Sequence, residues 1–161
     1  PEIQRLVGSM VLPGRQNYIK SSFVTDISDA AIDTLVTHFA TVPSPLTVVI
    51  FQQLGNTANR ARADATAFSH REARYELLIQ SIWLDRADAA RNIQWTRTVA
   101  EAMHPFTTGR PYVNQMGLEA EEGADRIKAA YGPNYERLVA LKNTYDPTNL
   151  FRHNQNIKPT A

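Results

Sequence analysis

The sequence contains no cysteine. This absence excludes disulfide bonds, thiolate metal sites and a cysteine nucleophile, while it leaves the redox compartment open. The chain also lacks any apolar run of the roughly 20 residues that are needed to span a bilayer, so we predict no membrane contact. The cellular location stays open at this point, with the cytoplasm favoured.

An excess of charge of either sign is also missing. The chain has 17 Lys and Arg against 16 Asp and Glu. Nearly balanced charge provides no net field that would attract a nucleic acid, an anionic membrane or an acidic substrate. We therefore predict no nucleic-acid partner.

Two kinds of binding motif are absent as well. There is no glycine-rich phosphate loop of either common kind, so nothing in the chain is expected to cradle a pyrophosphate. The histidines are scattered without the spacing of metal ligands, and no cysteine or clustered carboxylate supports them. We predict no metal site at these residues, which are His38, His70, His104 and His153.

The first half of the chain shows strand and helix patterns in alternation. Residues Asn17 to Val24 are rich in β-branched and aromatic side chains, which predicts a strand. Ser28 can cap a helix that follows. The run Leu46 to Phe51 is continuously apolar and of strand length, which predicts a central, buried strand. The apolar residues that recur at helical spacing after Ser28 are Ile32, Leu35, Val36 and Phe39.

The second half repeats the alternation. A strand is predicted from Tyr75 to Leu84, and a helix from Asp85 onward with a stripe that includes Trp95 and Val99. The sequence RPYVNQ, residues 110–115, predicts a short strand. Two more helices are predicted near the end, one after an acidic start at 119–122 and one with an apolar face. That face consists of Tyr135, Leu138, Leu141 and Tyr145.

This order of elements predicts an α+β fold. We expect a mainly antiparallel sheet with helices packed on one face, in a ferredoxin-like order, followed by an irregular C-terminal tail. On the predicted strand at 110–115, alternation places Tyr112 and Asn114 on the same face, where a half-buried amide needs hydrogen-bond partners. Core packing and ligand contact both remain open for this pair.

A family resemblance is carried by the end of the chain. The segment YGPNYERLVALKNTYDPTNLFRHNQNIKP, Tyr131 to Pro159, closely resembles the C-terminal signature of berberine bridge enzyme-like FAD-linked oxidases. Upstream pieces agree in the order of the family. They are KSSFV at 20–24, TAFSHR at 66–71, the two tryptophans Trp83 and Trp95, and YVN at 112–114.

The resemblance implies a role within a larger flavoprotein. Residues 1–130 would be the later part of a substrate-binding α+β domain, and residues 131–161 the berberine bridge enzyme-type C-terminal segment. The FAD would be bound mainly by a separate N-terminal domain that is absent from this chain, and that domain and a small-molecule substrate would be the partners. The implied reaction is oxidation of an alcohol, a sugar or a secondary metabolite by hydride transfer to the flavin.

The alternative is a non-catalytic α+β scaffold or dimerisation module derived from the family. A sheet face that lacked its partner domain would expose apolar surface, which predicts a homodimer. On either interpretation the chain by itself is expected to be inactive.

The resemblance also implies site residues. Tyr112 and Asn114 match the family motif and would contact the flavin or the wall of the site. The tyrosine that acts as the base in relatives is replaced by Gln115, and an amide has no proton affinity to offer at neutral pH. Alignment on Trp83 places Leu78 at a second catalytic position, with Gln80 two residues along on the same face. Gln115 and Gln80 are thus the candidates at catalytic positions. In the tail, hydrogen bonds to another domain are expected from Asn149, Asn154 and Gln155.

Overall fold

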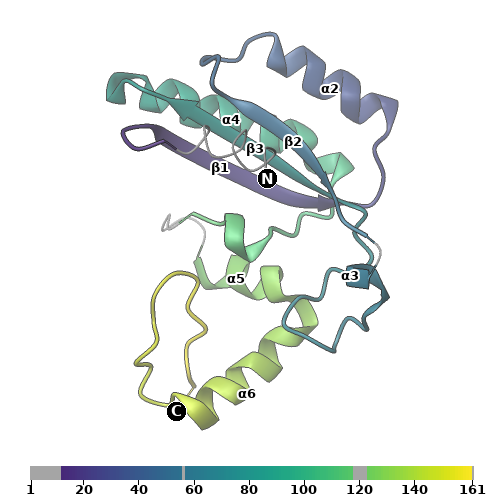
Figure 1. Cartoon of the computed structure of the whole chain (residues 1–161), viewed down its shortest axis with the longest axis vertical. Coiled ribbons are helices and arrows are strands. Elements are labelled where there is room, and N and C mark those ends of the chain that lie inside the picture. The colour runs from purple at the N-terminus through teal and green to yellow at the C-terminus, as the bar shows by residue number, and fades with distance from the viewer. Residues whose placement is uncertain (1–11, 56, 118–122, 161) are drawn as a thin grey trace.

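The computed structural model describes residues 12–55, 57–117 and 123–160. Three strands, β1 (Gln16–Val24), β2 (Val48–Gln53) and β3 (Tyr75–Trp83), form an antiparallel sheet in the order β1-β3-β2. Helices α2 (Asp29–Phe39) and α4 (Ala89–Met103) lie on one face of this sheet (Figure 1). The predicted α+β class, with helices on one face of an antiparallel sheet, is confirmed.

The hydrophobic core fills the space between the sheet and these two helices. The predicted stripe of α4 is confirmed, because Trp95, Val99 and Met103 are all buried. The indole of Trp95 also donates a hydrogen bond to the carbonyl oxygen of His38 at 3.2 Å. The buried members of the core are Val24, Ala31, Leu77, Ile79, Trp95, Val99 and Met103.

The prediction of a central strand at Leu46 to Phe51 is wrong in its position within the sheet. The strand begins at Val48 and lies at the sheet edge, with Ile50 37% exposed. The central strand is β3, which pairs with β1 on one side and β2 on the other. Which strand is central depends on pairing between distant segments, and a continuous apolar run does not encode that pairing.

The helix predicted after Ser28 is confirmed, but its predicted buried face is confirmed only in part. The Ser28 side chain accepts a hydrogen bond from the backbone N–H of Ala31, as an N-cap should. Ala31 is buried, whereas Ile32 and Val36 are 45% and 65% exposed. Alanine allows a helix to approach a sheet closely, so α2 packs on its small residue. Of its larger apolar side chains, Leu35 also packs against the core, whereas Ile32 and Val36 remain at the surface.

The predicted face of the last helix fails in the same way. Helix α6 (Tyr135–Tyr145) buries Val139, while Leu141 is 44% and Tyr145 80% exposed. The helix is apolar on more than one side, so periodicity alone could not select the side that packs.

The strand predicted at residues 110–115 is also wrong. After α4 and a 3₁₀ turn at His104–Phe106, the chain runs beside the edge of β1 and ends in a second 3₁₀ turn, η4 (Val113–Gln115). The contact with β1 uses two hydrogen bonds, from Phe23 N to Arg110 O and from Thr108 N to Phe23 O. Beyond Arg110 the backbone N–H of Tyr112 bonds the Ser21 side chain in place of a β1 carbonyl, at 3.3 Å.

The remaining elements form a closing layer beneath the sheet (Figure 1). It comprises the short helix α3 (Thr57–Arg60), α5 (Gly123–Tyr131), the turn η6 (Gly132–Asn134) and α6. The acidic residues 119–122 that were expected to open a helix lie outside the described residues. The loop before β3 holds this layer, because the Asn134 amide donates to the carbonyl oxygens of Ala63 and Thr66 at 2.6 and 2.9 Å.

A close approach between Gly132 and Ser69 reinforces that junction. Gly132 has φ +56, and a Cβ added to it would lie 2.9 Å from the Ser69 hydroxyl oxygen. Gly132→Ala should lower the free energy of unfolding by about 2 kcal/mol, from left-handed backbone strain and the clash together. Urea unfolding of the chain measures the loss. Gly14→Ala is the control, since Gly14 also has positive φ but nothing within 4 Å, and its cost should be about 1 kcal/mol. Adding Ser69→Ala to the Gly132→Ala variant should recover part of the lost free energy of unfolding, because it removes the hydroxyl that the new Cβ meets. If nothing is recovered, the clash does not contribute.

Candidate functional site

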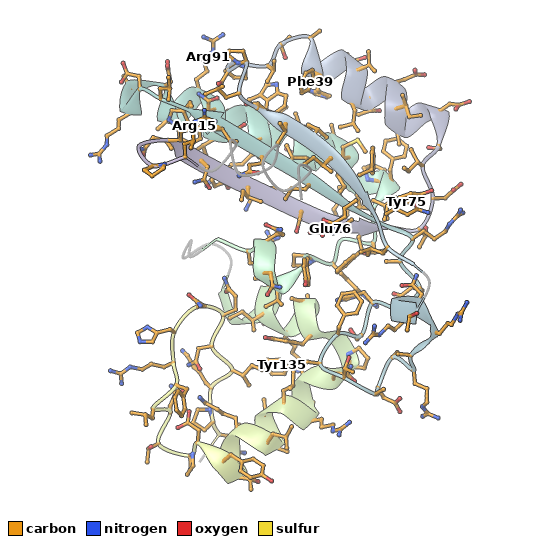
Figure 2. The ribbon with its side chains drawn as sticks, in the orientation of Figure 1. Arg15, Phe39, Tyr75, Glu76, Arg91 and Tyr135 are labelled. Carbon is orange, nitrogen blue, oxygen red and sulfur yellow. The ribbon has the colours of Figure 1, made fainter. Side chains whose placement is uncertain are left out.

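The sheet face that points away from α2 and α4 carries the candidate site. Side chains alternate along a strand, and Leu77 and Ile79 belong to the core between sheet and helices. Glu76, Leu78 and Gln80 therefore project from the opposite face of β3. Figure 2 shows Glu76 on the side of the sheet that faces the closing layer.

Strand β1 contributes neighbouring positions to the same face. In the strand register, Ser21 pairs with Leu78 and Phe23 with Glu76. Ser21 accepts a hydrogen bond from the backbone N–H of Tyr112 at 3.3 Å. The η4 turn is thereby attached to this face of the sheet.

Tyr112 and Asn114 are brought together, although by a turn and not by strand alternation. The Asn114 amide donates a hydrogen bond to the Tyr112 hydroxyl oxygen at 2.9 Å. The Tyr112 ring lies 5.9 Å from the ring of Phe23 and 6.0 Å from that of Phe68. Because its oxygen already accepts a hydrogen bond, the phenol can direct its own proton to another acceptor.

His70 connects this aromatic cluster to the closing layer. Its ring stacks on Phe23 with centroids 4.4 Å apart, and its Nε2 lies 2.6 Å from the carbonyl oxygen of Ala130. A carbonyl oxygen only accepts, so Nε2 carries the proton and donates it. Burial lowers the pKa of His70, which keeps the imidazole neutral.

Gln115 and Gln80, the two candidates at catalytic positions, lie on different elements. Gln115 ends η4, and its backbone N–H donates to the Tyr112 carbonyl oxygen at 2.9 Å. Gln80 is half-buried on β3, between Ile19 of β1 and Val48 of β2. Within the described ranges no hydrogen bond joins the two glutamine side chains. Their catalytic roles, and the flavin contacts of Tyr112 and Asn114, stay predictions.

One acidic residue on this face escaped the sequence analysis. Glu76 is only 2% exposed, and burial raises the pKa of its carboxyl to about 7. The signal available in the sequence was a carboxylate inside a strand of otherwise buried residues, in YELLIQSIW. Carboxyl groups of this kind concentrate at functional sites.

A polar cavity of about 610 Å³ lies between η4 and the C-terminal tail. The Gln155 amide bonds the carbonyl oxygens of Met116 and Gly117 at 3.1 and 3.0 Å. The hydrogen bonds that were expected to reach another domain from Gln155 are thus made within the chain. The cavity is lined by Val113, Asn114, Met116, Tyr131, His153, Asn154 and Gln155.

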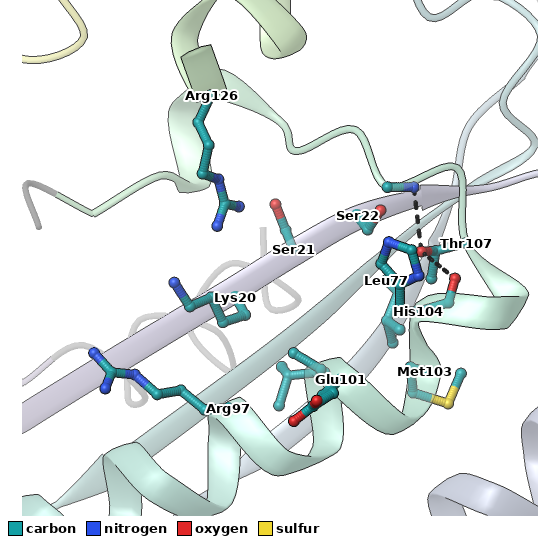
Figure 3. Close-up of a pocket in the computed structure, with 13 residues that line it drawn as sticks. Lys20, Ser21, Ser22, Leu77, Arg97, Glu101, Met103, His104, Thr107 and Arg126 are labelled. Atoms are coloured by element: carbon teal, nitrogen blue, oxygen red, sulfur yellow. Dashed lines mark hydrogen bonds between the residues drawn. The ribbon is translucent and has the colours of Figure 1, made fainter. Parts of the chain in front are cut away.

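A second cleft, of about 390 Å³, opens on the other face of the sheet between β1 and α4 (Figure 3). Basic side chains from three elements surround it, namely Lys20, Arg97 and Arg126. Arg97 donates a hydrogen bond to the Tyr18 hydroxyl at 3.1 Å. None of the residues singled out from the sequence as catalytic or flavin-binding lines this cleft.

In the part of the chain that the structure describes, no group of three or more His, Asp or Glu residues is arranged to hold a metal ion. No described helix combines the length and the apolar character that crossing a membrane requires.

Comparison with known proteins identifies relatives over nearly the whole chain. Residues 111–158 match the family model described as "Berberine and berberine like". A FAD-linked oxidoreductase of Dictyostelium discoideum is 28% identical over 98% of this chain and 34% of its own length. The uncharacterized FAD-linked oxidoreductase YgaK of Bacillus subtilis is 32% identical over 83% of this chain and 29% of its own length.

The solved structures agree on the fold. BBE-like 28 from Arabidopsis thaliana superposes with a TM-score of 0.80 at 24% identity, over 92% of this chain and 34% of that protein. The chain spans about a third of the length of the relatives that it matches. The match to residues 111–158 includes Tyr112, Asn114 and the closing layer from α5 onward. The chain therefore belongs to the berberine bridge enzyme-like family of FAD-linked oxidoreductases.

Proposed function

We propose that this chain is the C-terminal portion of a FAD-dependent oxidoreductase and forms the wall of the site that faces the substrate. The full-length protein would oxidise an alcohol, a sugar or a secondary metabolite by hydride transfer to the flavin. The observation that carries the proposal is the Tyr112–Asn114 pair, which lies inside the family-model match. Ser21 bonds this pair to the sheet face that points away from α2 and α4.

The described residues fit contact with one part of the cofactor. The Tyr112 phenol can donate its proton and the Asn114 amide oxygen can accept one, and Asn114 lines a cavity with polar side chains, which suits the polar edge of a flavin ring. The sequence holds no glycine-rich loop for the pyrophosphate of FAD. We therefore assign the main binding of FAD to an N-terminal domain outside these 161 residues.

Exposed apolar side chains at the end of α6 and in the tail that follows offer that domain a docking surface. Tyr145 is 80% exposed, Leu150 71% and Phe151 77%. Apolar surface gathered in this way is typical of a contact with another protein surface. We propose that these three residues face the FAD-binding domain.

Expression of the full-length protein tests the proposal. We expect a yellow protein with the visible absorbance of bound flavin, which is bleached under anaerobic conditions by a substrate. Suitable probes are D-glucose, lactose, benzyl alcohol and cinnamyl alcohol. A folded but colourless full-length protein would contradict the assignment.

Gln115 favours a second candidate function, a non-catalytic scaffold or dimerisation module. Its amide cannot serve as a general base. A scaffold would show no flavin reduction with any substrate, and the 161-residue chain would associate in sedimentation experiments. Flavin that is bound and reduced would exclude this second function.

Removal of the amide at position 114 gives a residue-level test in the full-length protein. Asn114→Ala deletes the donor to the Tyr112 oxygen, and a hydrogen bond contributes about 1 kcal/mol net. We expect flavin binding or flavin reduction to weaken about fivefold, measured by fluorescence titration and by anaerobic stopped flow. Asn17→Ala, at an exposed asparagine of β1, is the matched control and should behave as wild type. Equal behaviour of both variants would remove Asn114 from the site.

A further inference from the structure

The loop between α3 and β3 carries a segment to which the proposed function gives no role. It is TAFSHR, residues 66–71, one of the pieces that follow the order of the family. Connecting loops usually run over the surface. Here three consecutive side chains are instead withdrawn from solvent, since Phe68 is half-buried and both Ser69 and His70 are buried. These side chains therefore pack against other elements of the chain.

Phe68 contacts the ring of Tyr112. The two rings stand nearly perpendicular, with centroids 6.0 Å apart and planes at 88°. Phe68 also meets Phe23 edge to face, at 5.6 Å and 76°, and Phe23 in turn contacts Tyr112 at 5.9 Å. Edge-to-face contact is a preferred geometry for aromatic pairs, because the positive edge of one ring meets the negative face of the other. The direction of the Tyr112 ring is therefore set by two aromatic neighbours.

The loop also fixes Phe68 itself. The guanidinium of Arg71 lies 4.9 Å from the centroid of the Phe68 ring, a distance at which a cation is attracted to an aromatic ring. The same guanidinium donates a hydrogen bond to the Thr66 hydroxyl at 2.6 Å. Residues on both sides of Phe68 are thus bonded to each other, and one of them contacts its ring.

The same loop is bonded to the closing layer. The His70 Nε2–H donates to the carbonyl oxygen of Ala130 at 2.6 Å, and the Thr66 carbonyl oxygen accepts from the Asn134 amide at 2.9 Å. One loop therefore contacts both the closing layer and the ring of Tyr112. The position of Tyr112 relative to the closing layer depends on this loop.

We propose that Phe68 is a positioning residue, which holds the Tyr112 phenol beside Asn114 and the polar cavity that Asn114 lines. The inference rests on the proposed function. Phe68 has no group that exchanges a proton, so it acts only through its ring contact with Tyr112.

The test uses the flavin-loaded full-length protein and the variant Phe68→Leu, which keeps an apolar side chain and loses the ring. Flavin reduction is followed by anaerobic stopped flow with the four probes named above. The limiting rate of reduction should fall about tenfold, because small displacements of groups at a reacting centre lower the rate strongly. The substrate concentration that gives half of that rate should change less than about twofold. Phe68→Tyr keeps the aromatic ring and should restore the rate.

A double-mutant cycle shows whether the effect passes through Tyr112. Tyr112→Phe removes the hydroxyl and leaves the ring. If Phe68 positions that hydroxyl, Tyr112→Phe is itself slow, and adding Phe68→Leu to it lowers the rate no further. Two losses that multiply, or a Tyr112→Phe variant with the rate of wild type, would overturn the positioning role.

Phe39→Leu is the matched control. Phe39 makes a similar edge-to-face contact with Trp95, with centroids 6.2 Å apart and planes at 71°, but on the helix side of the sheet. This variant should keep the wild-type rate of flavin reduction. An equal loss of rate in Phe39→Leu and Phe68→Leu would attribute the effect to general loosening of the fold and overturn the proposal.

The outcomes separate this inference from the proposed function. A yellow Phe68→Leu protein that is reduced at the wild-type rate overturns the role of Phe68 and leaves the proposed function intact. A colourless full-length wild type would instead remove the proposed function. If Phe68→Leu fails to fold or to load FAD, Phe68→Met fills more of the space of the ring, and the same comparison with Phe39→Leu and Tyr112→Phe decides.

Discussion

Glu76→Gln should stabilise the 161-residue chain at alkaline pH relative to wild type. The difference in free energy of unfolding between the variant and wild type should grow by about 3 kcal/mol from pH 4 to pH 8. Burial raises the pKa of Glu76 from the ordinary 4.5 to about 7 in the folded chain. Urea unfolding of both proteins at each pH measures the difference.

The direction of this stability change follows from the number of protons bound to the folded and to the unfolded chain. Between pH 4.5 and pH 7 the unfolded chain has released this proton and the folded chain retains it. Stability contributed by the group is therefore fully present below pH 4.5 and is lost as the pH rises through 7. Glutamine does not titrate, so the variant escapes this loss. Glu72→Gln should give a difference that varies by less than about 0.5 kcal/mol over the same range, since exposed ion pairs contribute little.

If the pH dependence of unfolding were the same in wild type and Glu76→Gln, the enclosure of the carboxyl would be wrong.

His70→Ala should destabilise the chain by about 3 kcal/mol at pH 7.5. The substitution removes a fully buried ring that stacks on Phe23, and it leaves the carbonyl oxygen of Ala130 without its donor. The loss should concentrate in the closing layer, because this hydrogen bond joins β3's preceding loop to α5. Urea unfolding gives the total, and amide hydrogen exchange of residues 123–145 shows where protection is lost.

Two companion variants separate the contributions. His70→Phe keeps an aromatic ring against Phe23 and loses only the hydrogen bond, so about 1 to 2 kcal/mol should be lost. His153→Ala, at an exposed histidine of the tail, should be neutral. Burial lowers the pKa of His70. Its contribution is therefore present above the ordinary pKa of 6.5 and is lost as the pH falls through the lowered value, a loss that His70→Phe should abolish. A cost for His70→Ala no larger than for His153→Ala would show that the stack on Phe23 and the hydrogen bond to Ala130 contribute no stability.

Local signals in the sequence were sufficient for most elements. Ser28 caps α2 as expected, and the strand patterns from Asn17 and Tyr75 agree with β1 and β3 to within one residue at each end. These signals depend on side chains a few positions apart, which the sequence displays directly. The edge position of β2 and the burial of Ala31 in place of Ile32 depend on contacts between distant segments, and periodicity carries no information about those.

In the candidate site, too, the sequence predicts local features but not those that depend on contacts between distant segments. Tyr112 and Asn114 do lie together, but the expected strand is a 3₁₀ turn at Val113–Gln115. Glu76 was overlooked because its significance depends on its burial and its unpartnered oxygen. Both properties arise only when β1, β2 and the closing layer surround β3.

The burial of both tryptophans has a spectroscopic consequence. Trp83 and Trp95, the only two in the sequence, are 4% and 8% exposed and belong to the strand and helix of the sheet layer. The closing layer contains tyrosines but no tryptophan. Emission excited selectively in the indole band therefore reports on the sheet layer, and it stays silent when α5 and α6 detach. Both tryptophan probes of this chain therefore belong to the sheet layer.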